Sequence, residues 1–278
     1  MTAGEILITG CSSGIGLASA RALKARGWRV FATCRKEEDA ARRRGEGFES
    51  WRLDYADEIS VAEGAARALE LTAGRLSALF NNGAWAVPGP MEDVPRDAMR
   101  AIFEANLFGP QQLTGALIPA MRTAGGGRVV MCSSVLGMVA APCRGPYNAT
   151  KFALEGMADT YRRELQGSGI EMILIEPGPI LTPFRRNARA PFERWIRPAR
   201  ESSTHPAAIW EKIERRLYKD KEGGRFDLQP EAVAAKLIRA LEDRRPKARY
   251  FVTTPTYAAD LLRRVLPTRM LDRVMTGR

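Results

Sequence analysis

Short apolar runs alternate with longer amphipathic stretches along most of this chain, and the alternation restricts the folds that it can adopt. The runs occupy residues 5–9, 28–33, 48–53, 76–81, 127–133, 170–176 and 249–253. Stretches of helical length lie between several of them, at residues 17–26, 57–72, 96–122 and 146–166. Repeated strand–helix–strand units form a parallel sheet with helices on both faces, because their crossover connections are right-handed. The pattern therefore predicts an α/β fold with a doubly wound parallel sheet, in a single domain over residues 1–278.

One long stretch, residues 183–230, interrupts the alternation. It has no strand pattern, its aromatic residues stand among arginines, and a helix is expected only over residues 206–219. A long insertion in a compact domain is more often functional or mobile than ornamental. We therefore expect this insertion to serve as a substrate loop.

The composition is that of a globular protein that needs neither metal nor disulfides. With 278 residues, 45% hydrophobic and 27% charged, the chain is neither disordered nor a disulfide scaffold. Its four cysteines (11, 34, 132 and 143) form no C-x-x-C pair, and one histidine argues against a zinc site. We expect no bound metal, and reduced thiols in the cytoplasm. No apolar run approaches the roughly 20 residues of a membrane span, and a strand at residues 5–9 leaves no room for a signal peptide.

A glycine-rich turn directly follows the first apolar run. It reads Thr9-Gly-Cys-Ser-Ser-Gly-Ile-Gly16 and leads into a helical pattern. Glycines allow the backbone to approach a pyrophosphate, and the helix N-terminus adds free N–H groups and a positive dipole end. The spacing is G-x-x-x-G-x-G rather than G-x-G-x-x-G, and the alternative is a tight turn without a ligand. The cofactor-binding candidates here are Gly10, Ser12, Ser13, Gly14, Ile15 and Gly16.

The end of the second run bears on which dinucleotide is bound. NAD-binding folds usually carry an acidic residue there for the 2′-hydroxyl of the ribose. This chain has Cys34 and Arg35 instead, and Arg35 is suited to pair with a 2′-phosphate and to stack on adenine. Ser12 is placed to donate a second hydrogen bond. The sequence therefore favours NADP(H) over NAD(H), with a solvated surface arginine as the alternative for Arg35.

A tyrosine and a lysine stand four residues apart where a helix is expected. The segment Tyr147-Asn-Ala-Thr-Lys151 follows Gly145-Pro146, so both side chains share one helix face. Free tyrosine has a pKa near 10, and a neighbouring cation is needed to lower it for proton transfer near neutral pH. Ser134 ends the apolar run thirteen residues earlier, at the sheet edge where α/β folds place their chemistry. The alternative for the tyrosine and lysine is an ordinary pair on a helix surface.

Together these motifs resemble the short-chain dehydrogenase/reductase family, in a branch similar to the 17β-hydroxysteroid and retinol dehydrogenases and their bacterial relatives. The resemblance covers nearly the whole chain. Its motifs are residues 9–16, Asp54, residues 81–84, Asn106, Ser134, Tyr147, Lys151 and residues 177–182. One departure is Asn81-Asn-Gly-Ala84, where the family usually has N-N-A-G. The resemblance implies a Rossmann-like fold and a homodimer or homotetramer.

The resemblance also implies a catalytic tetrad of Asn106, Ser134, Tyr147 and Lys151. Tyr147 would exchange a proton with the substrate oxygen while a hydride passes between nicotinamide and carbonyl carbon. Ser134 would hydrogen-bond that oxygen, and Lys151 would hold the nicotinamide ribose and lower the pKa of Tyr147. Asn106 would position a water that feeds protons to Lys151. The alternative for Asn106 is a buried amide satisfied by backbone groups.

Further cofactor contacts are implied residue by residue. Asp54 would meet the adenine amino group, Asn82 would border the adenosine ribose, and Ile180 with Thr182 would bind the nicotinamide carboxamide. The remaining cofactor-binding candidates are Tyr55, Gly83, Pro177 and Gly178, together with Tyr147 and Lys151.

The segments expected to surround the substrate are rich in bulky apolar residues. A surface of this kind favours a steroid-, retinoid- or lipid-like ketone, aldehyde or alcohol over a sugar. Alternatively, several of these residues only pack the substrate loop onto the sheet. The set consists of Trp85, Val87, Leu136, Met138, Val139, Phe184, Phe192, Trp195 and Ile196.

Two other functions fit parts of the sequence less well. A non-catalytic NADP(H)-binding regulator on the same fold would be expected to lack Tyr147 or Lys151, and both are present. A nucleic-acid binder is suggested only by the net charge of +11, and no zinc-finger or RNA-binding motif accompanies it. We therefore expect a small hydrophobic substrate and no nucleic acid.

The positive charge is confined to one part of the chain. Basic and acidic residues balance over residues 1–184, so the whole excess of +11 lies in residues 185–278. The segment 256–278 contains two basic amphipathic patterns, residues 261–267 and 270–275. This segment fits a solvated or subunit-contacting tail. The alternative hypothesis is a peripheral contact with an anionic membrane surface.

Overall fold

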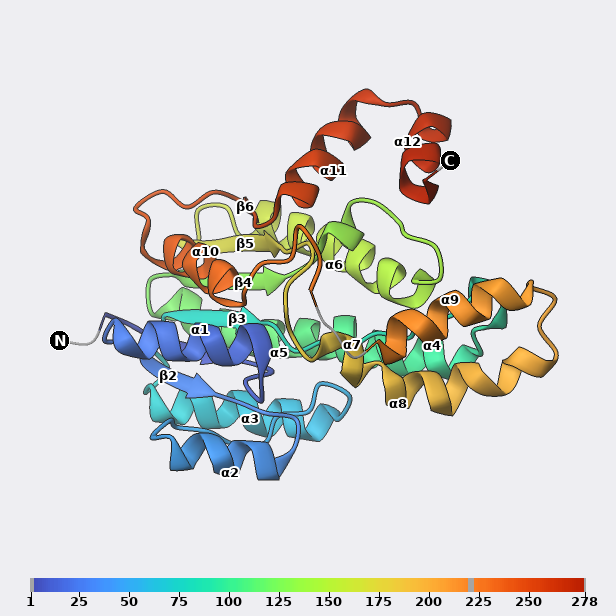
Figure 1. Ribbon diagram of the computed structural model, residues 1–278. Helices are drawn as coiled ribbons and strands as arrows, with labels where there is room; N and C mark the ends of the chain where they lie inside the picture. Colours follow the sequence, from blue (N-terminus) through green and yellow to red (C-terminus); the bar gives the residue numbers. More distant parts are fainter. Residues whose placement is uncertain (1–2, 220–222, 278) are drawn as a thin grey trace.

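The computed structural model describes residues 3–219 and 223–277 and contains a six-stranded parallel sheet. The strand order is β2-β1-β3-β4-β5-β6 (Figure 1). The strands are β1 (Glu5–Ile8), β2 (Arg29–Ala32), β3 (Ala78–Asn81), β4 (Gly127–Cys132), β5 (Ile170–Glu176) and β6 (Arg249–Phe251). Most of their residues are buried, because helices cover both faces and both faces therefore need apolar side chains. The predicted doubly wound α/β fold is confirmed.

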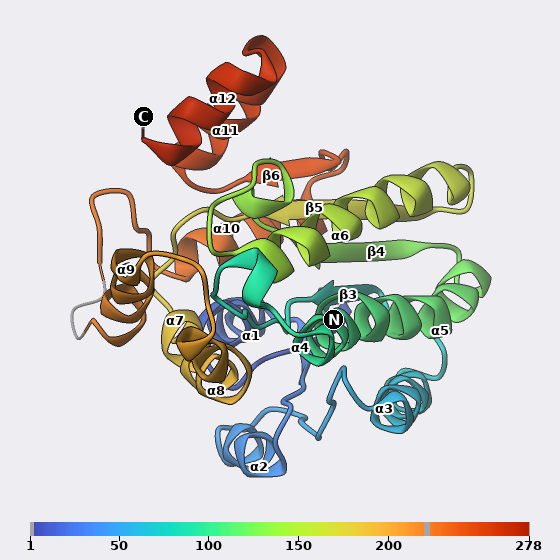
Figure 2. The same cartoon turned by 90° about the vertical axis from the view of Figure 1, so that its right-hand side faces the viewer.

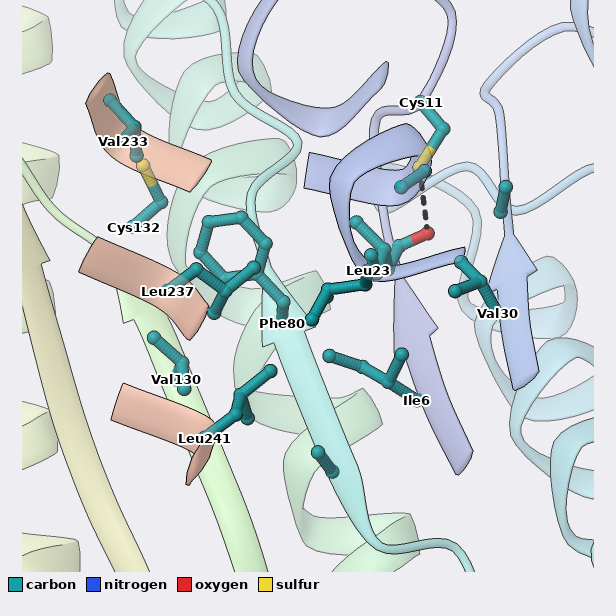
Figure 3. Close-up of a cluster of buried hydrophobic side chains, with 14 of the residues drawn as sticks. Ile6, Cys11, Leu23, Val30, Phe80, Val130, Cys132, Val233, Leu237 and Leu241 are labelled. Carbon is teal, nitrogen blue, oxygen red and sulfur yellow. Dashed lines mark hydrogen bonds between the residues drawn. The ribbon is translucent and has the colours of Figure 1, made fainter. Parts of the chain in front are cut away.

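Helices flank the sheet on both faces (Figures 1 and 2). One face carries α1 (Gly14–Ala25) and α10 (Glu231–Glu242), which pack against each other. Figure 3 shows Leu23 of α1 and Leu237 of α10 meeting Phe80 of β3 in the apolar layer between them. The other face carries α3 (Glu58–Leu71), α5 (Gly109–Thr123) and α6 (Gly145–Glu164). A short charged helix, α2 (Glu37–Gly45), follows β2.

The predicted strand at residues 48–53 is wrong as a full strand. This segment runs parallel to β2 but joins it only through two isolated bridges, Phe31 to Glu49 and Cys34 to Arg52. Between them the hydroxyl of Ser50 donates to the carbonyl of Ala32 at 2.5 Å. The side chain thus occupies an acceptor that a regular ladder uses for a backbone N–H, which explains the interruption.

The predicted helix at residues 96–122 is broken by a wide turn. It consists of α4 (Arg96–Phe103), a π-helical turn (Glu104–Phe108) and α5. Pro110 has no N–H to donate to the carbonyl of Asn106 four residues earlier, so the regular α-helical bond cannot form there. Gly109 is needed at the same place, because a Cβ atom on it would lie 2.4 Å from the carbonyl oxygen of Tyr55.

The substrate loop packs against α4, α6 and the segment that follows β3. It contains two short helices, α7 (Phe184–Asn187) and α8 (Arg189–Pro191), a π-helical turn (Phe192–Ile196), a 3-10 turn (Arg197–Glu201) and α9 (Ala207–Tyr218). Its two ends meet where the N–H of Leu181 donates to the carbonyl of Leu228 at 2.9 Å. The loop therefore stands on a closed base beside the carboxyl end of β5.

Two more helices end the chain, α11 (Thr254–Val265) and α12 (Thr268–Thr276). They project from the side of the molecule near β6 and α6 (Figures 1 and 2). Over residues 3–219 and 223–277, no helix combines the length and the apolarity that crossing a bilayer requires.

Candidate active site

The predicted site residues gather at the carboxyl edge of the sheet. The glycine turn follows β1, Asn82 and Gly83 follow β3, Ser134 follows β4, and Pro177 follows β5. Because these strands are parallel neighbours in the order β1-β3-β4-β5, their ends lie side by side. Helix α6 adds Tyr147 and Lys151 from its first two turns.

The glycine turn is shaped by contacts that leave no room for side chains. Gly10 and Gly14 have positive φ angles of 71° and 56°, which L-residues rarely adopt. A Cβ atom on Gly16 would lie 2.4 Å from the carbonyl oxygen of Gly10. The side chain of Ser13, at the N-cap position, makes no capping hydrogen bond, so α1 begins with N–H groups that no side chain caps. This turn fits a pyrophosphate cradle.

A buried network of uncharged side chains holds the cradle in place. The hydroxyl of Thr9 accepts hydrogen bonds from the backbone N–H groups of Asn82 (3.0 Å) and Gly83 (3.1 Å) and contacts the hydroxyl of Tyr55 at 2.8 Å. Tyr55 donates to Asn81, whose amide donates to Thr114 at 2.9 Å. This network, which we call the neutral cluster, joins β1, β3 and α5.

Three residues predicted to contact the cofactor make contacts within the protein itself. The Tyr55 side chain is buried and its hydroxyl is engaged in the neutral cluster. The side-chain amide of Asn82 donates to the carbonyl of Thr9 at 3.0 Å. Gly83 packs against the ring of Tyr55, where an added Cβ atom would lie 3.1 Å from the ring. These three residues shape the cradle from behind.

The residues predicted to select the dinucleotide stand at the other side of the glycine turn. Arg35 and Ser12 are exposed, whereas Cys34 is buried. Asp54 is half-buried, and its carboxylate accepts a hydrogen bond from the backbone N–H of Ala56 at 3.1 Å. Ser12, Arg35 and Asp54 thus lie on segments that follow the adjacent strands β1 and β2, outside the packed core.

The segment after β5 connects the cradle to the Ser134 turn. The carbonyl of Pro177 accepts from the N–H of Val135 at 2.8 Å. Gly178 lies against Thr253 and Thr256, where any Cβ atom would clash. At the other end of the segment, a Cβ atom on Gly14 would lie 3.0 Å from the methyl group of Thr182. Ile180 forms a parallel bridge with Leu228 at the base of the substrate loop.

Tyr147 is buried. Burial raises the pKa of its phenol above the ordinary value, and the neighbouring Ser134 hydroxyl only partly offsets this. The hydroxyl of Ser134 also accepts from the N–H of Leu136 at 3.1 Å, which fixes its position at the end of β4. The ring of Phe184, from the substrate loop, packs edge-on against Tyr147 at 5.3 Å between centroids. The site therefore presents a neutral hydroxyl pair next to an apolar wall.

Lys151 lies on the same helix face as Tyr147 but has a backbone partner. Its ammonium group donates to the carbonyl of Cys132 at 2.7 Å and stands 5.6 Å from the centre of the Tyr147 ring. Burial lowers the pKa of Lys151. We expected Lys151 to lower the pKa of Tyr147. In this arrangement the pKa of the Tyr147 phenol is raised, because burial of the phenol outweighs the other influences on it.

Asn106 uses its side chain to hold the backbone of Trp85. Its amide oxygen accepts from the N–H of Trp85 at 3.1 Å, and its nitrogen donates to the carbonyl of the same residue at 2.9 Å. The nitrogen also reaches the hydroxyl of Thr150 on α6 at 3.2 Å. The Asn106 amide is thus buried with its hydrogen bonds satisfied, as in the alternative interpretation. It joins the π-helical turn to α6 beside Tyr147.

The apolar residues predicted around the substrate divide into two groups. Val87, Phe192 and Ile196 are fully buried and pack the substrate loop. Met138 and Val139 are also buried, in the turn that follows Ser134. A second group is partly exposed and packs in or against the cluster that contains Tyr147; it consists of Trp85, Leu136, Phe184 and Trp195. The rings of Trp85 and Trp195 stack at 5.6 Å. The packing interpretation therefore holds for the first group, and a substrate-facing surface stays a prediction for the second.

One buried cluster near the site is absent from the sequence predictions. Arg249 of β6 forms ion pairs with Glu155 of α6, Glu176 of β5 (2.6 Å) and Asp159 of α6 (2.8 Å). Glu155 comes one helical turn after Lys151, and Glu176 directly precedes Pro177. The signal that points to this charged cluster is an acidic residue, Glu176, that ends an otherwise apolar run.

Comparison with known proteins places this arrangement in a family. The short chain dehydrogenase family matches residues 5–192. The uncharacterized oxidoreductase YbbO of Escherichia coli K12 is 41% identical over 273 residues, covering 98% of this chain and 94% of that protein. An NADPH-dependent 3-dehydrocapnine reductase of Ornithobacterium rhinotracheale is 32% identical, covering 96% of this chain and 94% of that protein. Human 17-beta-hydroxysteroid dehydrogenase type 1 is 31% identical, covering 89% of this chain and 77% of that protein.

The chain belongs to the short-chain dehydrogenase/reductase family, as the ordered motifs predicted. It is therefore an oxidoreductase that acts between an alcohol and a carbonyl group and uses a nicotinamide cofactor. The similarity to a 17-beta-hydroxysteroid dehydrogenase also confirms the predicted resemblance to that branch.

Proposed function

We propose that this protein is an NADP(H)-dependent oxidoreductase that interconverts a hydrophobic ketone or aldehyde and its alcohol. The observation that carries the proposal is the buried Tyr147 hydroxyl beside Ser134, bordered by the ring of Phe184. A phenol at this place can exchange a proton with a substrate oxygen that gains or loses negative charge.

The chain's own groups supply the proton and the positioning. When bound in the glycine cradle, NADPH supplies the hydride. Ser134 donates a hydrogen bond to the substrate carbonyl, and Tyr147 transfers its proton to the same oxygen. Lys151 holds the nicotinamide ribose hydroxyls, and Asn106 keeps Trp85 against the substrate. Ile180 and Thr182 would bind the nicotinamide carboxamide, as the family resemblance implies; the contact of Thr182 with Gly14 and the bridge of Ile180 to Leu228 support this.

The preference for NADP(H) rests on the residues that follow β2. Arg35 is exposed there, and no acidic residue stands in its place to repel a 2′-phosphate. Ser12 is exposed on the neighbouring glycine turn. The relative from Ornithobacterium rhinotracheale is NADPH-dependent, which supports the same preference here.

A hydrophobic substrate fits the partly exposed rings beside Tyr147. Trp85, Phe184 and Trp195 offer apolar surface and few hydrogen-bonding groups, which suits a steroid-, retinoid- or lipid-like molecule rather than a sugar. The similarity to a 17-beta-hydroxysteroid dehydrogenase supports this class of substrate.

The test is turnover of a panel of apolar ketones and aldehydes, followed by NADPH oxidation, with Tyr147→Phe beside the wild type. Loss of a general acid lowers kcat/KM about 100-fold or more. Tyr161→Phe, on the same helix α6, is the matched control and keeps wild-type turnover. Activity that survives Tyr147→Phe overturns the proposed mechanism.

The coenzyme preference is tested in the same assay with Arg35→Asp. The wild type turns over with NADPH in preference to NADH, and the variant loses about 10- to 100-fold in kcat/KM for NADPH, as expected for a lost charged hydrogen bond and a new repulsion. Arg122→Asp, at the exposed end of α5, controls for the change in net charge. A wild type that uses NADH equally well contradicts the assignment of Arg35.

A further inference from the structure

Helices α11 and α12 expose large parts of several apolar side chains, of which Tyr257 also packs edge-on against the ring of Phe251. Tyr257, Leu261 and Val265 of α11 are 51%, 61% and 61% exposed, and Met270 and Val274 of α12 are 50% and 53% exposed. The spacing of four residues places each set in one row along its helix. We call these five residues the apolar stripe.

The opposite faces of α11 and α12 are packed against other parts of the protein. Ala259 is buried, and Leu262, Leu266, Leu271 and Met275 are half-buried where the two helices contact each other. Each helix therefore carries one apolar row for packing and a second row that faces outward. A second outward row is not needed to fold a helical hairpin, so it indicates a surface that meets something else.

Four arginines accompany the stripe. Arg263 and Arg264 each pair with Asp260, at 3.2 Å and 3.0 Å. Arg269 and Arg273 are exposed on α12. Residues 254–277 hold four arginines and two aspartates, within the part of the chain that carries the whole excess of positive charge. Exposed apolar side chains flanked by arginines are the pattern of a helix that lies in a membrane interface.

The base of the helix pair is held rigidly at the candidate active site. Thr253 and Thr256, at the start of α11, are buried and lie against Gly178. Helix α11 also contacts the turn at Val135–Gly137 that follows Ser134. The far ends of the helices project from the body (Figures 1 and 2). Whatever binds the stripe is therefore held next to the Ser134 side of the site.

We propose that the apolar stripe and the arginines of α11 and α12 dock this protein on an anionic lipid surface. A second copy of the chain fits less well, because a twofold contact through this patch sets arginines against arginines. An anionic bilayer complements the charge and receives the apolar row at the level of the headgroups. Docking does not depend on the proposed reductase activity.

The test is flotation of the full chain with vesicles of phosphatidylcholine alone and of phosphatidylcholine with phosphatidylglycerol. We expect the protein to float with the anionic vesicles only, and high salt to release a large part of it. Leu261→Ser with Val265→Ser, and separately Arg269→Glu with Arg273→Glu, reduce the bound fraction at least about tenfold. All four positions are exposed, so these substitutions leave the fold intact.

Matched controls lie elsewhere on the surface. Ile59→Ser removes an apolar side chain that is 66% exposed on α3, and Arg122→Glu reverses a charge on α5; both leave vesicle binding unchanged. Reduction of a water-soluble carbonyl by the stripe variants reports the reductase function separately. Equal binding to neutral vesicles, or binding that the stripe variants do not weaken, overturns the proposal. So does a stripe-dependent dimer, detected by light scattering, that does not bind vesicles.

Discussion

Two buried polar clusters beside the carboxyl edge of the sheet each join neighbouring elements, one through neutral groups and the other through charged groups. The neutral cluster of Thr9, Tyr55, Asn81 and Thr114 joins β1, β3 and α5 through hydroxyl and amide groups that each find a partner. The charged cluster of Glu155, Asp159, Glu176 and Arg249 joins α6, β5 and β6. One supports the glycine cradle, and the other supports the Lys151 helix and the segment that begins at Pro177.

The difference between the clusters lies in how completely they are satisfied. In the described part of the chain, one carboxylate oxygen of Glu155 and one of Glu176 are buried without a hydrogen-bond partner. Buried carboxylates are costly unless they are paired, so Glu155 and Glu176 depend on Arg249, whereas Asp159 also pairs with Arg162 at 2.7 Å. A satisfied neutral network carries no such dependence and does not titrate near neutral pH. The cradle side of the site is thus held independently of pH, whereas the α6 side is not.

The largest expected effect comes from Arg249→Met. Removing the one cation shared by three carboxylates leaves buried negative charge uncompensated, and we expect the free energy of unfolding to fall by about 3–5 kcal/mol. Urea denaturation above pH 8, where the Glu176 carboxyl is ionised as well, measures the change. Arg239→Met, which breaks an exposed pair with Asp243, is the control and changes stability by less than about 1 kcal/mol.

A rescue sharpens this result. Glu155→Gln and Glu176→Gln, combined with Arg249→Met, remove the charges that the arginine neutralises and restore part of the lost stability. If Arg249→Met alone lowers the free energy of unfolding no more than Arg239→Met does, the charged cluster does not depend on its arginine. The two clusters then do not differ in the way proposed.

A smaller effect is expected from Tyr55→Phe in the neutral cluster. The change removes the donor to Asn81 and leaves that buried acceptor unpaired, at a cost of about 1–3 kcal/mol. Because burial raises the pKa of the Tyr55 phenol above its ordinary value, the phenol stays protonated at acidic and neutral pH, and the loss is the same at both. Tyr161→Phe on α6 serves as the control in the same denaturation series. A loss that varies strongly with pH contradicts the neutral character of this cluster.

Local sequence patterns correctly predicted the helices and strands that bury an apolar face. They failed to predict elements that make few apolar contacts. The parallel strands were readable as apolar runs, because both of their faces are covered. Helix α2 was not, since only Ala40 and Arg43 of its nine residues are buried and it has no apolar face. The run at residues 48–53 looked like a strand, but Ser50 interrupts its ladder.

The same distinction applies to the candidate site. Tyr147 and Lys151 are four residues apart, so helix geometry alone brings them to one face. Glu155 and Arg249 are 94 residues apart and meet only because β6 joins the sheet next to β5, with Arg249 opposite Leu174. No local spacing encodes that contact. Likewise, the raised pKa of Tyr147 reflects burial beneath the substrate loop rather than its spacing from Lys151.

The smallest and most specific effect is on the pH dependence of stability. Burial, reinforced by the charge of Glu155, raises the pKa of Glu176 to about 8 from an ordinary 4.5, although Arg249 opposes the shift; Asp260 contributes in the same direction as Glu155. Between these pH values the folded protein keeps a proton that the unfolded chain has lost. This contribution to stability is complete below about pH 4.5 and is lost as the pH rises through 8.

Glu176→Gln removes this titration, so its free energy of unfolding declines less steeply than that of the wild type as the pH rises across that window. Urea denaturation at several pH values measures both slopes. Glu171→Gln changes an exposed carboxylate on the same strand and keeps the wild-type slope. Equal slopes for Glu176→Gln and the wild type mean that Glu176 is ionised throughout. Arg249 then satisfies the cluster fully, and the α6 side of the site is as insensitive to pH as the cradle side.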